Sequence, residues 1–409
     1  MPLYRGWSVV VACGILASFS WGLGFYGLGV YLHALNRLHG WSAGLISVAV
    51  TVYYAVSAGG IVLVGGVIDR HGPRGVLTYG VVSMAAAVAA LGLITTPWQL
   101  FAVYLVLATS WSCLSLTGIS STILPWFGRR QGLAMTLALT GASVGGMVLV
   151  PILVTLVQHR GFQFATTAAG AAALVIGLPL VLLVIRGRPS THEVAIELER
   201  HGATGPGDEG TRQSRVWTRQ EVLRVPLLWT LIVPFTLALA AQVAFIVHQI
   251  SLLEPYLGES RAALTVSATT VAALLGRIAL GVLSDRVDLC NLSAFNVGAQ
   301  GVALAAMAMW PSPAVFVVAS LVFGLGVGNL ITLPPLLARE EFGQRSFGIV
   351  FGLVAAIAQV GVALGPGLMG LLRDALGSYQ PVLWCLVGLE SLAVAAVLWG
   401  KVLRRVADK

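Results

Sequence analysis

Twelve long apolar runs divide this chain of 409 residues and constrain its fold more than any other feature. A helix rises about 1.5 Å per residue, so some twenty apolar residues cross a hydrocarbon core of about 30 Å. Only 10% of the residues are charged, whereas soluble proteins carry about 25%. We therefore predict an all-α membrane protein that crosses the bilayer many times. The predicted spans cover residues 7–33, 43–68, 74–94, 98–124, 131–157, 162–185, 226–253, 262–284, 292–310, 313–338, 346–372 and 379–400.

One polar stretch interrupts this series, between the sixth and the seventh span. Residues 186–225 are rich in charged residues, contain several glycines and include no run of spanning length. The sequence therefore predicts three parts: an N-terminal six-helix bundle over 1–185, a cytoplasmic linker over 186–225 and a C-terminal six-helix bundle over 226–409.

The basic residues predict the orientation. With both termini in the cytoplasm, nineteen of the twenty-four Lys and Arg residues lie on cytoplasmic segments. Arg37, Arg160, Arg261 and Arg373 fall outside, and Arg277 lies within a span. This is the asymmetry that the positive-inside rule describes. It also explains the net charge of +8 without a nucleic-acid partner.

The two halves repeat one another. Residues 65–70 (GGVIDR) recur at 281–286 (GVLSDR), and Pro151 recurs as Pro366. Landmarks that recur at offsets of 215 and 216 residues indicate a duplicated six-helix unit with pseudo-two-fold symmetry. In such transporters the substrate site is expected between the halves, near the middle of the membrane.

Three motifs carry a resemblance to a known family. The loop after the second span reads Gly65-x-x-x-Asp69-Arg70-x-Gly72-Pro73-Arg74, which resembles the major facilitator superfamily. Residues 4–7 (YRGW) and 126–134 (WFGRRQGLA), running on to 141–146 (GASVGG), resemble its monocarboxylate transporter and oxalate:formate antiporter group. The resemblance implies a secondary active transporter in the inner membrane. It would move a small monocarboxylate such as lactate or pyruvate, coupled to a proton, by alternating access.

Arg277 is the first candidate for substrate binding. It lies eight residues before Asp285, about two helical turns inside the eighth span. A charge in the membrane is costly and usually faces a cavity or a partner. Its guanidinium can grip a carboxylate through two parallel hydrogen bonds, and the resembling transporters carry a substrate-binding arginine here. The alternative is a structural arginine that pairs with Asp285 or caps a neighbouring helix.

Further candidates for substrate binding come from helical phase and from the resemblance. Gln242 and Phe245 share a face of the seventh span with His248 and Gln249. The remaining candidates are Tyr26, Ser115, Asn329 and Gln359. Each polar member has an alternative role, since such side chains also hydrogen-bond between helices in lipid.

Two departures from the resembling transporters refine the prediction. Residues 346–372 carry no charge, whereas the dicarboxylate antiporters carry a lysine in that span; a single fixed cation favours a monoanion. Ala273 stands where the vertebrate symporters carry an acid, one turn before Arg277. His248 is therefore the candidate proton carrier, because imidazole titrates near neutral pH. Alternatively, the substrate brings the proton itself; Glu254 and Glu390 are the other titratable candidates, with a structural role favoured for Glu390.

The repeated loop motif predicts gating residues. Asp69, Arg70 and Arg74 follow the second span, and Asp285 and Arg286 follow the eighth. A carboxylate there can accept from a helix N-terminus and pair with a base, which resembles a cytoplasmic latch. Arg129 and Arg130 are the expected partners of Asp285.

The sequence offers no catalytic chemistry. No nucleophile–base pair, metal-ligand spacing or Walker motif occurs, so we expect neither an enzyme nor a cofactor or metal. The expected partners are a small carboxylate, a proton and the bilayer, and the expected state is a monomer. Two alternatives stay open: an exporter of a weak organic acid, a metalloid or a drug on the same fold, and a membrane receptor that transports nothing.

Overall fold

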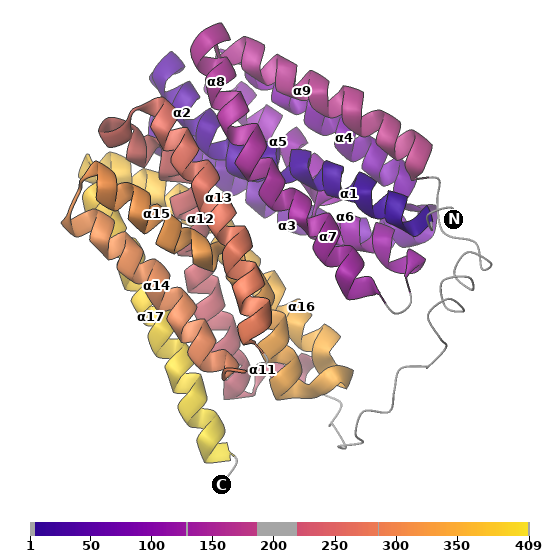
Figure 1. Ribbon diagram of the computed structural model, residues 1–409, viewed down its shortest axis with the longest axis vertical. Coiled ribbons are helices and arrows are strands. Elements are labelled where there is room, and N and C mark those ends of the chain that lie inside the picture. The colour runs from indigo at the N-terminus through magenta and orange to yellow at the C-terminus, as the bar shows by residue number, and fades with distance from the viewer. Residues whose placement is uncertain (1–4, 128–129, 186–218, 285, 408–409) are drawn as a thin grey trace. The chain divides into compact units, whose positions relative to one another are not determined.

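The computed structural model describes residues 5–127, 130–185, 219–284 and 286–407, and these residues are helical with short connections (Figure 1). They pack as two compact units. Among these residues, the first comprises 5–40, 52–127 and 130–185, and the second comprises 41–51, 219–284 and 286–407. Most of the linker predicted over 186–225 lies outside the described residues.

Twelve helices of the described part are long and apolar enough to cross a membrane. Each overlaps one of the twelve predicted runs, so the prediction of an all-α protein with twelve spans is confirmed. The described residues contain no strand.

The first unit contains the first six spans, several of which are interrupted. Three interruptions are π-helical segments, which occur often at functional sites. The elements are α1 (Arg5–Trp21), η1 (Gly22–Tyr26), α2 (Gly27–His39), most of α3 (Ala43–His71), α4 (Pro73–Leu91), α5 (Pro97–Leu114), α6 (Leu116–Ile123), η2 (Leu124–Trp126), α7 (Gln131–Val144), η3 (Gly145–Leu149), α8 (Val150–Arg160), α9 (Phe162–Pro179) and η4 (Leu180–Val184).

Glycines bring the first and the fifth span into backbone contact. A Cβ atom on Gly145 would lie within 3 Å of the Gly22 nitrogen, so η1 and η3 pack directly against each other. In lipid the hydrophobic effect does not drive helices together, so their association depends on close packing. Small residues such as these glycines allow that close approach of the helix backbones. Two of the three π-helical segments of the first unit, η1 and η3, are therefore in direct backbone contact.

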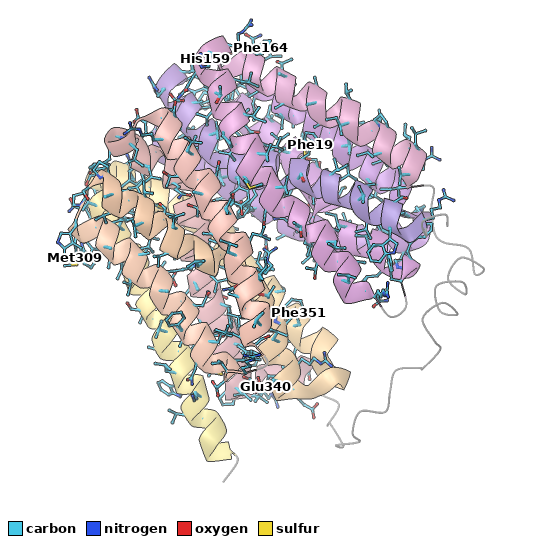
Figure 2. The ribbon with its side chains drawn as sticks, viewed as in Figure 1. Phe19, His159, Phe164, Met309, Glu340 and Phe351 are labelled. Atoms are coloured by element: carbon cyan, nitrogen blue, oxygen red, sulfur yellow. The ribbon has the colours of Figure 1, made fainter. Side chains whose placement is uncertain are left out.

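The second unit contains the last six spans and the first turns of α3. Its further elements are α11 (Arg219–Leu223), α12 (Pro226–Leu257), α13 (Glu259–Leu283), α14 (Leu289–Met309), α15 (Pro313–Val327), α16 (Asn329–Leu376) and α17 (Tyr379–Ala407). The long α16 comprises two helices that meet at Gly343, whose φ of 74° is accessible to glycine at little cost. Figure 2 labels Glu340 and Phe351, which lie on the two sides of this kink.

Asp288 begins α14 as an N-cap. Its carboxylate accepts a hydrogen bond from the backbone N–H of Asn291 (2.8 Å) and lies 3.6 Å from the Lys401 ammonium of α17. Partial burial alone would raise the pKa of Asp288, but the Asn291 N–H and the Lys401 charge outweigh it and lower that pKa. These contacts fix the start of α14 beside the end of α17.

Candidate functional site

Arg277 lies partly buried on α13, six residues before the helix ends at Leu283. Two glycines bring α13 and α15 into backbone contact. A Cβ atom on Gly324 would lie 2.5 Å from the Thr269 carbonyl oxygen, and Gly276 lies against the backbone of Leu325. This close packing places Arg277 beside the end of α15.

Gly328 separates α15 from α16 and lies directly against the Arg277 guanidinium. A Cβ atom on Gly328 would lie 2.9 Å from Arg277 Nε and 3.1 Å from Nη2. The next residue, Asn329, is buried, and its Nδ2 donates to Asn296 Oδ1 (2.9 Å) and to the Leu325 carbonyl (3.1 Å). The structure thus places two predicted site residues, Arg277 and Asn329, on either side of one glycine.

Gln242 and Phe245 are buried on α12. Gln242 Oε1 accepts a hydrogen bond from Gln300 Nε2 of α14 (3.1 Å). The Phe245 ring packs on Phe323 of α15, with ring centroids 4.4 Å apart. Both contacts are of the interhelical kind that the sequence leaves open as an alternative, and a direct role in binding stays a prediction.

His248 is fully buried among three helices of the second unit and the first turns of α3. Its Nε2 lies 3.0 Å from Ser47 Oγ of α3 and 3.2 Å from the Pro366 carbonyl of α16, and its Nδ1 lies 3.0 Å from the Tyr379 hydroxyl of α17. In the tautomer whose hydrogen lies on Nε2, the Nε2–H donates to the Pro366 carbonyl, which can only accept. Nδ1 then accepts from the Tyr379 O–H and is the atom where a second proton would bind.

Charged groups extend this cluster toward the start of α3. Arg373 lies over the Tyr379 ring, 5.7 Å from its centroid, and donates to Asp374 Oδ1 at 3.2 Å. Asp374 Oδ2 accepts from the backbone N–H of Gly44 (2.7 Å), in the first turn of α3. A carboxylate is stabilising at a helix N-terminus, where the backbone N–H groups point outward. We call His248, Ser47, Tyr379, Arg373 and Asp374 the α3 clasp.

Tyr26 and Ser115 both lie at helix irregularities of the first unit. Tyr26 ends η1 and is buried, with its ring edge-on to Phe25. Ser115 lies between α5 and α6 in an extended conformation, and its Oγ donates to the Ser112 carbonyl (2.8 Å). The Tyr53 hydroxyl donates to the Gly24 carbonyl inside η1 (2.7 Å), which ties α3 to this segment.

Two further polar residues lie on α16 and α17. Gln359 is partly buried on α16. Glu390 is fully buried on α17, and among the described residues no hydrogen-bond partner of its carboxyl oxygens is found. Its Cβ packs against Gly301 of α14. Burial of this kind is compatible with the structural role that the sequence favours for Glu390.

The predicted gating residues that the structure describes lie at helix ends or directly beside them. Asp69 and Arg70 are exposed in the last turn of α3, and Arg74 Nη2 donates to the Leu182 carbonyl in η4 (3.1 Å). Between them Gly72, with φ of 81°, allows the turn from α3 into α4. Arg130 and Arg286 are exposed. Asp285 and Arg129 lie outside the described residues, so their pairing stays a prediction.

Several residues of these clusters were missed from the sequence. No sequence motif points to Ser47, Tyr379 or Gly328. Their partners lie far away along the chain. The adjacent residues Arg373 and Asp374 form an ion pair, and their opposite charges beside the end of a span are visible in the sequence. Tyr53 and Tyr54 place two adjacent phenol hydroxyls in the middle of a span, and polar groups at that depth are a second sign of a site that is visible in the sequence.

Comparisons with known proteins agree on one family. Residues 13–366 and 247–408 match the family model described as Major Facilitator Superfamily. The chain is similar to MFS-type transporter 1 of Ophiocordyceps sp. (strain BCC 1869), with 28% identity over 374 residues that cover 88% of this chain and 78% of that protein. It is 25% identical to Monocarboxylate transporter 13 of Bos taurus over 382 residues, which cover 91% of this chain and 84% of that protein.

A solved structure is similar in fold. The nucleoside transporter NupG superposes with a TM-score of 0.74 over 96% of this chain and 98% of its own. The two sequences are 12% identical, so this likeness bears on the fold alone.

Proposed function

Because the chain belongs to the Major Facilitator Superfamily, a family of membrane transporters, we propose that it is a secondary active transporter of a small monocarboxylate such as lactate or pyruvate. The substrate would move by alternating access together with a proton. Arg277 is the observation that carries this proposal. It is a permanently charged group on a membrane-spanning helix, in a chain similar to proteins named monocarboxylate transporters.

The chemistry of Arg277 supports a carboxylate as the substrate. A guanidinium offers several N–H donors in one plane, and two of them match the two oxygens of a carboxylate. Such pairs are stronger where water is excluded, as in the middle of a membrane. The span that carries Gln359 has no charge of its own between residues 346 and 372, so a second carboxylate of the substrate would find no fixed cation there. This supports a monoanion.

His248 supports coupling to a proton. Its imidazole is buried in the α3 clasp, with Nδ1 facing the Tyr379 hydroxyl. A proton added at Nδ1 would require that hydroxyl to turn its own hydrogen away, which changes a contact between α12 and α17. Protonation of His248 would therefore be coupled to helix packing in the second unit.

The test is the substitution Arg277→Lys in purified protein reconstituted into liposomes. Lysine keeps the charge but replaces the planar pair of donors by a point charge. We expect uptake of labelled lactate and pyruvate to fall by about tenfold or more, with unchanged folded yield. The matched control is Arg261→Lys, which changes an exposed arginine in the first turn of the same helix and should leave uptake intact. Normal uptake by the Arg277→Lys protein would end the proposal.

A second arm of the same experiment separates this function from an exporter of lipophilic compounds. Uptake of lactate and pyruvate should rise when the liposomes carry an inward proton gradient. Lipophilic cations should not be taken up. Gradient-independent uptake would leave the carboxylate proposal standing without its proton, and transport of lipophilic cations in place of acids would replace it.

A further inference from the structure

We propose that Gly328 is a positioning residue for Arg277: the missing side chain at position 328 leaves the space in which the guanidinium lies when it binds the substrate carboxylate. This inference rests on the proposed function and deepens it. It concerns a residue that touches Arg277 and acts through it.

The geometry around Gly328 is tight on one side. A Cβ atom built there would lie 2.9 Å from Arg277 Nε, 3.1 Å from Arg277 Nη2 and 3.0 Å from the Ala273 carbonyl oxygen. All three distances are shorter than an ordinary van der Waals contact between heavy atoms, about 3.5 Å. Any larger residue at position 328 must therefore displace the guanidinium, the Ala273 backbone, or both.

The backbone of Gly328 does not itself require glycine. Its φ of −69° and ψ of −27° are right-handed helical values that any L-residue adopts. Alanine would even be favoured there by about 1 kcal/mol in helix propensity. The reason for a glycine at this position is the neighbouring Arg277 and Ala273, not the local conformation.

The duplicated half of the chain supplies an internal comparison. Gly60, Ser57 and Ser112 of the first unit lie 216 positions before Gly276, Ala273 and Gly328 of the second. The start of each helix supports this register, since Thr96–Pro97 and Ser312–Pro313 are separated by the same offset and both begin a helix.

The contacts also correspond. In the first unit, Ser112 Oγ donates to the Ser57 carbonyl (3.1 Å). In the second unit, Gly328 faces the equivalent Ala273 carbonyl. The space beside this carbonyl holds a serine side chain in one repeat and the Arg277 guanidinium in the other. The residue equivalent to Arg277 in the first unit is Ile61, which has no charged group to place.

A small displacement of the guanidinium has a specific consequence. Two parallel hydrogen bonds to a carboxylate need both donors in line with both oxygens, so a shift of a few tenths of an ångström weakens the grip. Misplacement by about 1 Å can cost a hundredfold in the rate of a reaction that depends on orientation. A side chain at position 328 would therefore weaken carboxylate binding without removing the charge.

The experiment is the substitution Gly328→Ser. It introduces into the second repeat the serine that the first repeat has at the equivalent position, Ser112. The KM for lactate uptake into proteoliposomes should rise by about tenfold, with kcat changed by less than about twofold. Gly352→Ser is the matched control, because nothing lies within 4 Å of a Cβ built on Gly352 of α16. We expect that control to leave both constants unchanged.

A thermal-unfolding cycle covers the case in which Gly328→Ser does not fold. Leucine at position 277 has no atom at the place of Arg277 Nε, so Gly328→Ser combined with Arg277→Leu should recover the folded yield and the lost Tm. Failure of that double variant to recover would show that the clash involves the Ala273 backbone, and it would overturn the inference.

The two proposals fail separately. A Gly328→Ser protein that folds with an unchanged KM, while Arg277→Lys abolishes uptake, overturns the positioning role alone. Normal uptake by Arg277→Lys overturns the proposed function, and the positioning role falls with it.

Discussion

At the scale of single residues, the second unit places its fixed charge and its titratable ring in different surroundings. Arg277 is partly buried beside a glycine at the break between α15 and α16. His248 is fully buried, and both ring nitrogens have hydrogen-bonding partners from other helices. A guanidinium stays charged at any working pH, whereas an imidazole can take up and release a proton. The two groups are therefore suited to different tasks, anion binding and proton coupling.

The substitution His248→Ala tests the second task. From about pH 8 to pH 5 we expect wild-type uptake to rise, because the proposed transport takes up a proton together with the substrate. The variant should show a flat profile, measured as initial uptake of labelled lactate into proteoliposomes. His159→Ala is the control, since His159 is exposed in the last turn of α8 (Figure 2) and should leave the profile unchanged. A wild-type profile in the His248→Ala protein would remove His248 from proton coupling.

At the scale of elements, α3 is a single helix of 29 residues whose parts belong to different units. Its residues up to Thr51 group with the second unit, and those from Val52 group with the first. The α3 clasp explains the first grouping. Asp374 accepts from the N–H of Gly44, Ser47 meets His248, and Gly370 of α16 has no side chain to keep Ser47 away. Asp374 therefore acts on α3 as a capping side chain supplied by another helix.

Removing this cap should loosen the first turns of α3. Asp374→Leu removes both the charge and the acceptor from the helix N-terminus, which is worth about 1 kcal/mol. Asp374→Asn keeps an acceptor and should cost less. We expect faster hydrogen–deuterium exchange at residues 43–51 in the leucine variant and an intermediate rate in the asparagine variant.

Glu340→Gln, which neutralises an exposed acid near the kink of α16, is the control for that measurement and should exchange like the wild type. Equal exchange at residues 43–51 in the wild type and in Asp374→Leu would show that Asp374 does not hold α3.

At the scale of the whole molecule, the distribution of charge follows the order of the spans. Nineteen of the twenty-four basic residues fall on alternate connections and on the two termini. Basic residues are retained on the cytoplasmic side during insertion, so this distribution predicts that both termini are cytoplasmic. The family and the twelve spans support a multi-pass membrane protein, and the orientation is a prediction of its own.

Reporter fusions test the orientation. A fluorescent protein fused after Lys409 should be bright, and alkaline phosphatase fused there should be inactive, because the phosphatase folds only outside the cytoplasm. Phosphatase fused after Gly161 or Gly258, in the connections after the fifth and the seventh span, should be active. The reverse pattern would contradict the predicted topology.

Part of the candidate site followed from the sequence because its signal was chemical. Arg277 is conspicuous as an arginine in an apolar run, and His248 as an imidazole in another. Gln242 and Phe245 followed from helical phase, yet the structure pairs them with Gln300 and Phe323 of other helices. Phase tells which residues share a face and leaves open which neighbour that face meets.

The sequence by itself determined the number of spans, the duplication and the residue that carries an intramembrane charge, since these depend only on run length, repetition and side-chain chemistry. The tertiary structure alone decided that Gly328 lies against Arg277, that Ser47 and Tyr379 meet His248, and that α3 begins in the second unit. In lipid, both the outward and the inward face of a helix are apolar, so the hydropathy pattern does not record which face touches a partner. Neighbours are chosen by close packing of small residues and by a few buried hydrogen bonds, and these contacts exist only once the helices are assembled.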